Sequence, residues 1–288
     1  MSHAAVHGCN AARRRTFRLD GLTLRALEWG APGRPGLCLL HGGSAHAHWW
    51  DRVAPAFADR YHVLALDQRG HGESEWPTPP SGSTSYATEA FVGDLLGVMG
   101  VLGWERMALV GHSMGGHNAM AFGAWHPEHL WALVVVDSRP SIPPERLAAM
   151  HRRGHRGPRR HETLESAVRS FRLLPPETTA DPALLEHLAR EGIAERAGRF
   201  LYRFDPDCNG TRRPTDMWPL LGRITAPTLV VRGEHSPILP REMAREMAKR
   251  IPRARVEEIP GTHHHLVLDR PDAFVRILDD FLGGIPSA

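Results

Sequence analysis

Cysteine is scarce in this chain of 288 residues, which contains only Cys9, Cys38 and Cys208. The three lie far apart, their number is odd, and no two of them form a C-x-x-C pair. This distribution argues against a disulfide framework and against a zinc knuckle. It is typical of a protein from a reducing compartment, and we expect the protein to be cytoplasmic.

Long apolar runs are also missing. No stretch reaches the roughly 18 consecutive apolar residues that a membrane-spanning helix needs, so we expect no membrane insertion. The first residues contain no apolar segment before Arg13-Arg14-Arg15, which argues against a signal peptide. We predict that residues 1–15 form a flexible N-terminal tail.

A strong charge of one sign is absent as well. The formal net charge is only +3, so we expect no nucleic-acid partner. Nearly all the positive charge comes from arginine, because Lys249 is the single lysine. The composition is 42% hydrophobic and 23% charged, which is ordinary for a globular protein.

What the chain does contain is a regular alternation of apolar runs and helical patterns. Residues 16–28 alternate around Asp20-Gly21, which predicts a hairpin. Six further runs predict buried strands at 36–40, 61–66, 107–110, 130–136, 226–231 and 255–259. Helical patterns occur at 49–58, 85–102, 114–126, 241–250 and 272–282. The alternation predicts an α/β fold with a mostly parallel eight-stranded sheet and helices on both faces.

The alternation stops between residues 141 and 221. This segment has no strand-like run and consists of charged, proline-broken helical stretches. We therefore predict a core domain of residues 16–140 and 222–288, with a helical cap (141–221) inserted after the sixth strand. Within the cap, residues 151–160 contain five arginines and no acidic residue. We interpret this run as a solvated surface, with an anion-binding lid as the alternative.

The sequence Gly111-His112-Ser113-Met114-Gly115 has the pattern G-x-S-x-G, between a predicted strand and a predicted helix. This context is typical of a nucleophile elbow, a strained turn that exposes a serine hydroxyl above the sheet. Strand and helix approach so closely there that side chains at positions 111 and 115 would clash. Ser113 is therefore the candidate nucleophile.

A serine nucleophile needs donors for the oxyanion that forms on the carbonyl oxygen. One candidate is the backbone N–H of Met114, directly after Ser113. The other is the N–H of Gly43, in the glycine turn that follows the first buried strand. A loop without side chains lets this amide approach the substrate.

Three adjacent histidines, His263, His264 and His265, follow the last predicted strand. One of them can act as the base that takes the proton of Ser113. A metal site is disfavoured, because neighbouring side chains point in different directions and no carboxylate or cysteine cluster accompanies them. We therefore expect neither a metal nor another cofactor.

In combination these motifs resemble those of the α/β-hydrolase fold, in the large group that carries a helical cap. The resemblance spans roughly residues 16–284. It rests on His41-Gly42-Gly43, Asp67–Ser74, Gly111–Gly116 and the histidine before Leu-Asp-Arg-Pro271. Counting back from Pro271, it implies that His264 is the catalytic histidine, with His265 as the alternative. It also implies a structural role for the loop Asp67–Ser74, in which His71 could touch substrate.

The acid that orients the histidine is where the sequence departs from this resemblance. The family usually carries an aspartate after the seventh strand, but here that position is Ser236. We predict that Asp137 replaces it, because some members of the fold carry the acid after the sixth strand. Glu234 is the alternative acid, and loss of the acid is the third possibility. Losing the carboxylate costs about 10⁴ in kcat in the triad template.

The sequence thus predicts a serine hydrolase that cleaves a small or medium carboxylic ester through an acyl-enzyme intermediate. A serine at position 113 excludes the aspartate-nucleophile chemistry of the dehalogenases and epoxide hydrolases of this fold. The expected partner is a small-molecule ester. Two alternatives remain: a C–C bond hydrolase or perhydrolase-type enzyme, and a non-catalytic binding protein on the same fold.

Overall fold

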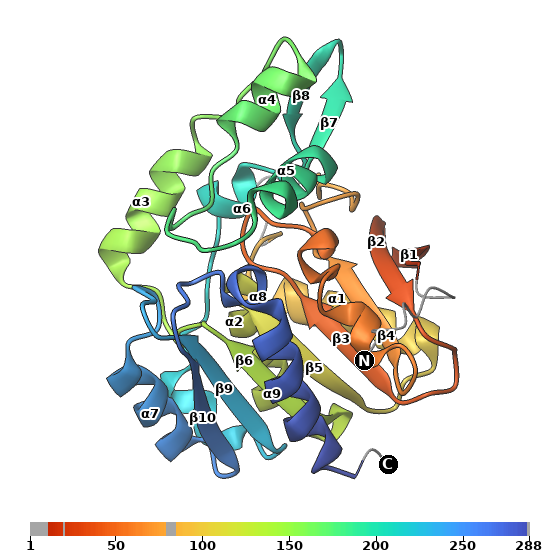
Figure 1. Ribbon diagram of the computed structural model, residues 1–288, viewed down its shortest axis with the longest axis vertical. Coiled ribbons are helices and arrows are strands. Elements are labelled where there is room, and N and C mark those ends of the chain that lie inside the picture. The colour runs from red at the N-terminus through yellow and green to blue at the C-terminus, as the bar shows by residue number, and fades with distance from the viewer. Residues whose placement is uncertain (1–10, 20, 79–84, 287–288) are drawn as a thin grey trace, which may run out of the picture.

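The computed structural model describes residues 11–19, 21–78 and 85–286. Its centre is an eight-stranded sheet with the order β1-β2-β4-β3-β5-β6-β9-β10 (Figure 1). The strands are β1 (Arg13–Leu19), β2 (Leu22–Trp29), β3 (Gly36–Leu40), β4 (His62–Asp67), β5 (Met107–His112), β6 (Leu130–Val136), β9 (Thr228–Gly233) and β10 (Ala254–Ile259). Strand β2 runs antiparallel to both its neighbours, and all other pairs are parallel. The predicted α/β fold is confirmed.

The central strands are buried on both faces. In β3, Leu37 and Leu39 pack into one apolar cluster, whereas Cys38 and Leu40 pack into the other. Successive side chains of a strand point to opposite faces, so a strand covered on both sides reads as a continuous apolar run. This is why the sequence reveals these strands clearly.

Helices cover both faces of the sheet (Figure 1). One face packs against η1 (Ala47–Trp50), η2 (Ala54–Phe57), α8 (Leu266–Asp269) and α9 (Pro271–Gly283). The other packs against α1 (Thr88–Leu102), α2 (Met114–Trp125), η4 (Trp218–Arg223) and α7 (Arg241–Arg250). A short turn, η3 (Pro127–His129), joins α2 to β6. Among the described residues, no helix combines the length and the apolar character that crossing a membrane requires.

The chain between β6 and η4 forms an insert beyond the sheet, at the top of Figure 1. It contains α3 (Pro144–Gly154), α4 (Leu164–Ser170), α5 (Pro182–Glu191), β7 (Ile193–Arg196), β8 (Arg199–Tyr202) and α6 (Asp207–Gly210). The N–H of Met217 donates to the carbonyl oxygen of Pro140 at 2.9 Å. The chain therefore leaves the core and returns to it through two hydrogen-bonded stems.

Three local predictions were wrong. The insert is not free of strands, because β7 and β8 form an antiparallel hairpin. Residues 49–58 form no single helix but lie in two 3₁₀ turns, with Pro55 at the start of the second. Strand β1 begins at Arg13, so the predicted tail is too long by three residues. Residues 1–10 of that tail, and Asp20 of the predicted hairpin turn, lie outside the described residues.

Candidate active site

Ser113 lies at the junction of β5 and α2 with φ 53° and ψ −114°, a backbone conformation that L-residues rarely adopt. The neighbouring glycines permit this turn. A Cβ on Gly111 would lie 2.2 Å from the carbonyl oxygen of Gly115, and one on Gly115 would lie 2.6 Å from that of Leu40. Only glycine fits at either place, so the junction has the geometry that the G-x-S-x-G pattern indicates.

Three side chains from distant parts of the sequence form one hydrogen-bonded chain at this junction. The Oγ of Ser113 lies 3.0 Å from Nε2 of His264. The Nδ1 of His264 lies 2.7 Å from Oδ2 of Asp137. Because a carboxylate can only accept, His264 carries its proton on Nδ1 and presents the lone pair of Nε2 to the serine. This tautomer is the one that a general base for a serine hydroxyl requires.

Asp137 is fully buried and follows the last residue of β6 with a positive φ of 44°. Its Oδ1 accepts the backbone N–H of Gly233 at 3.1 Å, and its Oδ2 accepts the hydroxyl proton of Ser236 as well as His264 Nδ1–H. Three donors therefore surround the carboxylate and hold its orientation. Ser236, the residue at which the resemblance fails, is one of them.

The other acid and histidine candidates lie elsewhere. The Glu234 carboxylate, about 39% exposed, accepts the N–H of Gly261 at 2.8 Å and has no hydrogen bond to His264 within the described chain. His265 hydrogen-bonds through Nε2 to the carbonyl oxygen of Pro175 at 2.9 Å. The backbone N–H of His263 donates to Asp269. Neither of these two histidines has a hydrogen bond to Ser113 within the described chain.

His112, the second residue of the elbow, fixes the backbone that carries the base. Its Nε2 lies 2.9 Å from the carbonyl oxygen of His264, so Nε2 carries the proton. Burial, with His264 and His265 nearby, lowers the pKa of His112 well below its usual value, and the ring is neutral. No local pattern in the sequence indicates this contact, because it joins residues 152 positions apart.

The two predicted oxyanion donors lie side by side. A Cβ built on Gly43 would be 3.9 Å from the Cβ of Met114, and both residues line the cavity at Ser113. Met114 is the first residue of α2, where backbone N–H groups have no acceptor within the helix. His41 anchors the glycine turn: its Nε2 accepts the N–H of Gln68, and its carbonyl oxygen accepts the side-chain amide of Gln68.

The loop from Asp67 to Ser74 has the structural role that the resemblance implies. Asp67 accepts the N–H groups of Ala47 and Glu73 at 2.6 and 2.9 Å, and Arg69 forms a bidentate ion pair with Asp94. The ring of His71 is tilted against that of His41, with 5.1 Å between the ring centroids. It is not among the described residues that line the cavity at Ser113.

Ser113 and His264 open into a cavity of about 530 Å³ between the sheet and the insert. Apolar side chains, such as Met150 and Ile238, and polar side chains share its wall. Four arginines line it: Arg139, Arg146, Arg153 and Arg212. The described lining includes one acidic residue, the exposed Glu145. The cavity is therefore positively charged.

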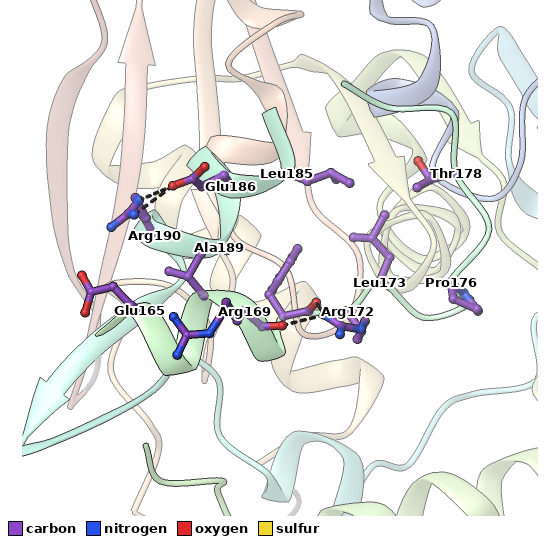
Figure 2. A pocket seen from close by; sticks show the side chains of 12 residues that line it. Glu165, Arg169, Arg172, Leu173, Pro176, Thr178, Leu185, Glu186, Ala189 and Arg190 are labelled. Carbon is purple, nitrogen blue, oxygen red and sulfur yellow. Dashed lines mark hydrogen bonds and ion pairs between the residues drawn. The ribbon is translucent and has the colours of Figure 1, made fainter. Parts of the chain in front are cut away.

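A second cavity, of about 490 Å³, lies within the insert between α4 and α5 (Figure 2). Arg169, Arg172, Glu186 and Arg190 are among the residues that line it, and Arg190 pairs with Glu186. Its described lining includes no serine, cysteine or histidine. Without a histidine in its described lining it has no counterpart of the Ser113–His264 pair, so the cavity at Ser113 is the candidate active site.

Among the described residues, two groups of side chains have the spacing to hold a metal ion: His112 with His264 and His265, and His48 with Asp51 and His187. In the first group, His264 is already hydrogen-bonded to Ser113 and Asp137. In the second, both histidines lie 2.9 Å from Oδ2 of Asp51. The hydrogen bonds within each group account for its geometry.

Comparison with known proteins agrees with this architecture. A model of the family described as "Alpha/beta hydrolase family" matches residues 39–277. The chain is 25% identical to 2-(acetamidomethylene)succinate hydrolase of Mesorhizobium japonicum over 273 residues, which is 93% of this chain and 94% of that protein. It is 28% identical over 258 residues to 2-hydroxy-6-oxononadienedioate/2-hydroxy-6-oxononatrienedioate hydrolase of Cupriavidus pinatubonensis, covering 87% and 88% of the two chains.

The fold also matches solved structures. The crystal structure of E-2-(acetamidomethylene)succinate hydrolase superposes with a TM-score of 0.83, covering 95% of this chain and all of the other. The sequence identity in that superposition is 24%, so this match shows the fold alone.

Proposed function

We propose, from the premise that this chain belongs to the alpha/beta hydrolase family, that it is a serine hydrolase acting on a small or medium carboxylic ester. The observation that carries the proposal is the hydrogen-bonded chain from Ser113 Oγ through His264 to Asp137. A serine hydroxyl with a correctly oriented neutral imidazole and a buried carboxylate behind it is the arrangement that activates serine for acyl transfer. The natural substrate enters the cavity beside Ser113.

In the proposed reaction, Ser113 Oγ attacks the ester carbonyl while His264 Nε2 takes the hydroxyl proton. Asp137 stabilises the imidazolium that forms. The backbone N–H groups of Gly43 and Met114 hold the oxyanion, and each such donor contributes roughly 2.7–4 kcal/mol in the transition state. His264 then gives its proton to the departing alcohol oxygen. A water molecule, deprotonated by His264, releases the acid and restores Ser113.

The buried contacts of Asp137 also bear on the non-catalytic alternative. That alternative depended on a missing acid after the seventh strand, at position 236. Because Asp137 contacts His264 and is oriented by Gly233 and Ser236, a carboxylate stands behind the imidazole. This supports an enzyme over a binding protein.

The free cysteines Cys38 and Cys208, both buried, support our assignment of the protein to the cytoplasm.

A C–C bond hydrolase is the second candidate, favoured by the likeness to the hydrolase of Cupriavidus pinatubonensis. The same nucleophile, base and oxyanion donors can serve either reaction. Turnover of a short-chain aryl ester by the purified protein would support the proposed ester hydrolase. Cleavage of a vinylogous 1,5-diketone with no ester turnover would favour the second candidate instead.

A fluorophosphonate probe tests the nucleophile directly, because it reacts with activated serines. We expect rapid labelling of the wild-type protein and none of Ser113→Ala. Ser141→Ala is the matched control, since Ser141 lies outside the lining of the cavity, and it should label like wild type. Equal labelling of wild type and Ser113→Ala would refute the proposal.

A further inference from the structure

The guanidinium of Arg212 is buried beside the active site without a carboxylate partner in the described chain. The residue is 3% exposed, and Nη1 has no hydrogen-bond partner. Nη2 lies 3.4 Å from Oδ1 of Asn118, and the guanidinium carbon lies 5.3 Å from the centre of the Phe91 ring. These neutral neighbours position the group but do not balance its charge.

Among the described residues, no neighbouring side chain supplies the missing negative charge. Cys208 is the group that interacts most with Arg212, but burial raises the pKa of its thiol to about 12, so it is neutral. Burial lowers the pKa of His117 to about 4, and this ring is neutral as well. Asp205 accepts hydrogen bonds from the hydroxyl of Tyr86 and the N–H of Asp207.

An unpaired buried charge is costly, with an effective penalty of several kcal/mol per ion even after the protein relaxes. Proteins rarely retain such a group without a counter-charge. Arg212 lines the same cavity as Ser113 and His264, so a ligand in the cavity can reach it. The counter-charge is therefore available from a bound molecule.

A second arginine points to the same kind of ligand. Arg139 also lines the cavity, and its buried Nε has no partner in the described chain. Burial and the nearby Arg146 lower the pKa of Arg139, which reflects an unfavourable environment for its charge. Two arginines with unpaired donors thus face one cavity, whose single described acidic residue, Glu145, is exposed.

We propose that this cavity recognises an ester that bears a carboxylate away from the scissile carbonyl, and that Arg212, with Arg139, binds that carboxylate. This inference rests on the proposed function, since it assigns the substrate class of the same site. A carboxylate is preferred over a phosphate, because only Arg212 is fully buried and its single charge matches that of a carboxylate. Arg212 is a binding residue here and takes no part in the chemical step.

The test compares charged and neutral esters on the wild-type protein. One pair carries the charge on the acyl side: 4-nitrophenyl hydrogen glutarate and its methyl ester. The other carries it on the alcohol side: O-butyryl glycolate and its methyl ester. We expect kcat/KM to favour the acid of at least one pair by about 10- to 100-fold, the range of a charged hydrogen bond. Preference for the neutral ester, or no preference, in both pairs would overturn the inference.

Substitution shows which residue carries the preference. Arg212→Gln should reduce the acid-to-ester ratio to within about threefold, whereas Arg213→Gln should keep the wild-type ratio. Arg213 is its neighbour in sequence, is exposed, and does not line the cavity. Arg139→Gln supplies a second variant if Arg212→Gln does not fold, with a smaller loss of the ratio expected. Wild-type ratios in both variants would assign the preference to other residues and overturn the role of Arg212.

Binding to Ser113→Ala separates this inference from the proposed function. Calorimetry with monomethyl glutarate should give a Kd that is about 10- to 100-fold weaker in the double variant with Arg212→Gln. If the proposed serine hydrolase function is wrong, no ester is turned over, yet the difference in Kd between the two variants persists. If only the anion site fails, esters are cleaved and the difference vanishes. Tighter binding of inorganic phosphate than of monomethyl glutarate would overturn the choice of carboxylate.

Discussion

The hydroxyl of Ser236 donates a hydrogen bond to Oδ2 of Asp137, the same oxygen that accepts Nδ1–H of His264. Strands β6 and β9 are neighbours in the sheet, so the chain ends that follow them meet. The Oγ of Ser236 in turn accepts the N–H of Ile238 at 3.0 Å, which fixes the hydroxyl. Ser236, at the position where the family usually carries the acid, thus helps to orient Asp137.

Replacing Ser236 by alanine should therefore lower activity without removing the acid. A hydrogen bond to a charged group is lost, and we expect kcat on a short-chain aryl ester to fall about 10-fold. Steady-state kinetics of Ser236→Ala measure this, with Ser141→Ala as the control. A kcat within twofold of wild type would show that the other two donors suffice to hold Asp137.

Removing the charge of Asp137 should have a far larger effect. In Asp137→Asn the amide cannot stabilise an imidazolium, and we expect a loss of about 10⁴ in kcat, as in the triad template. Glu234→Gln is the matched control, because that carboxylate contacts Gly261 and not the imidazole. A larger loss of kcat in Glu234→Gln than in Asp137→Asn would show that Glu234 is the acid.

The close contact at the elbow predicts a steric effect on stability. Gly111→Ala places a Cβ 2.2 Å from a backbone oxygen, so the free energy of unfolding should fall by about 1–3 kcal/mol or more. Gly93→Ala in α1 is the control, since a Cβ there meets nothing within 4 Å. Alanine favours a helix over glycine, so Gly93→Ala should stabilise by up to about 1 kcal/mol. Chemical denaturation of both variants measures the difference.

Buried histidines make the fold sensitive to acid. Burial lowers the pKa of His71, His117 and His265 to about 4, below the ~6.5 of an unfolded chain. The unfolded state therefore binds more protons between these values, and stability should fall as the pH drops from about 6.5 toward 4. Each histidine contributes on the order of 1–2 kcal/mol between pH 7 and pH 5.

One buried acid opposes this trend. Burial raises the pKa of Asp67 to about 6, so its folded form gains a proton as the pH falls and offsets about one histidine. Urea titrations at pH 7, 6 and 5 should still show a net loss of several kcal/mol. In His265→Gln the number of protons taken up on unfolding should fall by about one. Stability independent of pH over this range would contradict the prediction.

The parts of the fold that the sequence predicted are those with a strong local pattern. The buried strands are continuous apolar runs, and the elbow needs glycine at fixed positions. The hairpin β7–β8 has neither feature: its strands are rich in charge, and its turn is Ala197-Gly198, both at positive φ. A hairpin turn is usually recognised from Asn-Gly or Asp-Gly, so this one gave no signal. The break at Pro55, by contrast, was readable, because proline cannot continue a helix interior.

The candidate site also contains residues that a local pattern predicts and residues that no local pattern indicates. Ser113, the glycine turn and the histidine after β10 stand next to strand ends, where a parallel sheet gathers functional groups. The contact between Ser236 and Asp137 depends on the loops of two strands meeting, which no local pattern encodes. Arg212 lies in the insert, in a stretch with neither periodicity nor a motif. Its importance appears only when its burial and its missing counter-charge are seen together.

The hydrogen bond between Met217 N–H and the Pro140 carbonyl closes the neck of the insert. Asp137 stands just before that neck, and the residues that hold it, Gly233 and Ser236, come after the chain has rejoined the sheet. The neck therefore bounds the insert, and nucleophile, base and acid all lie in the core outside it. Arg212 lies on the insert, whereas Arg139, the second arginine of the proposed anion site, lies in the core just before the neck. The reacting groups thus come from the core alone, whereas the proposed anion site is divided between the core and the insert.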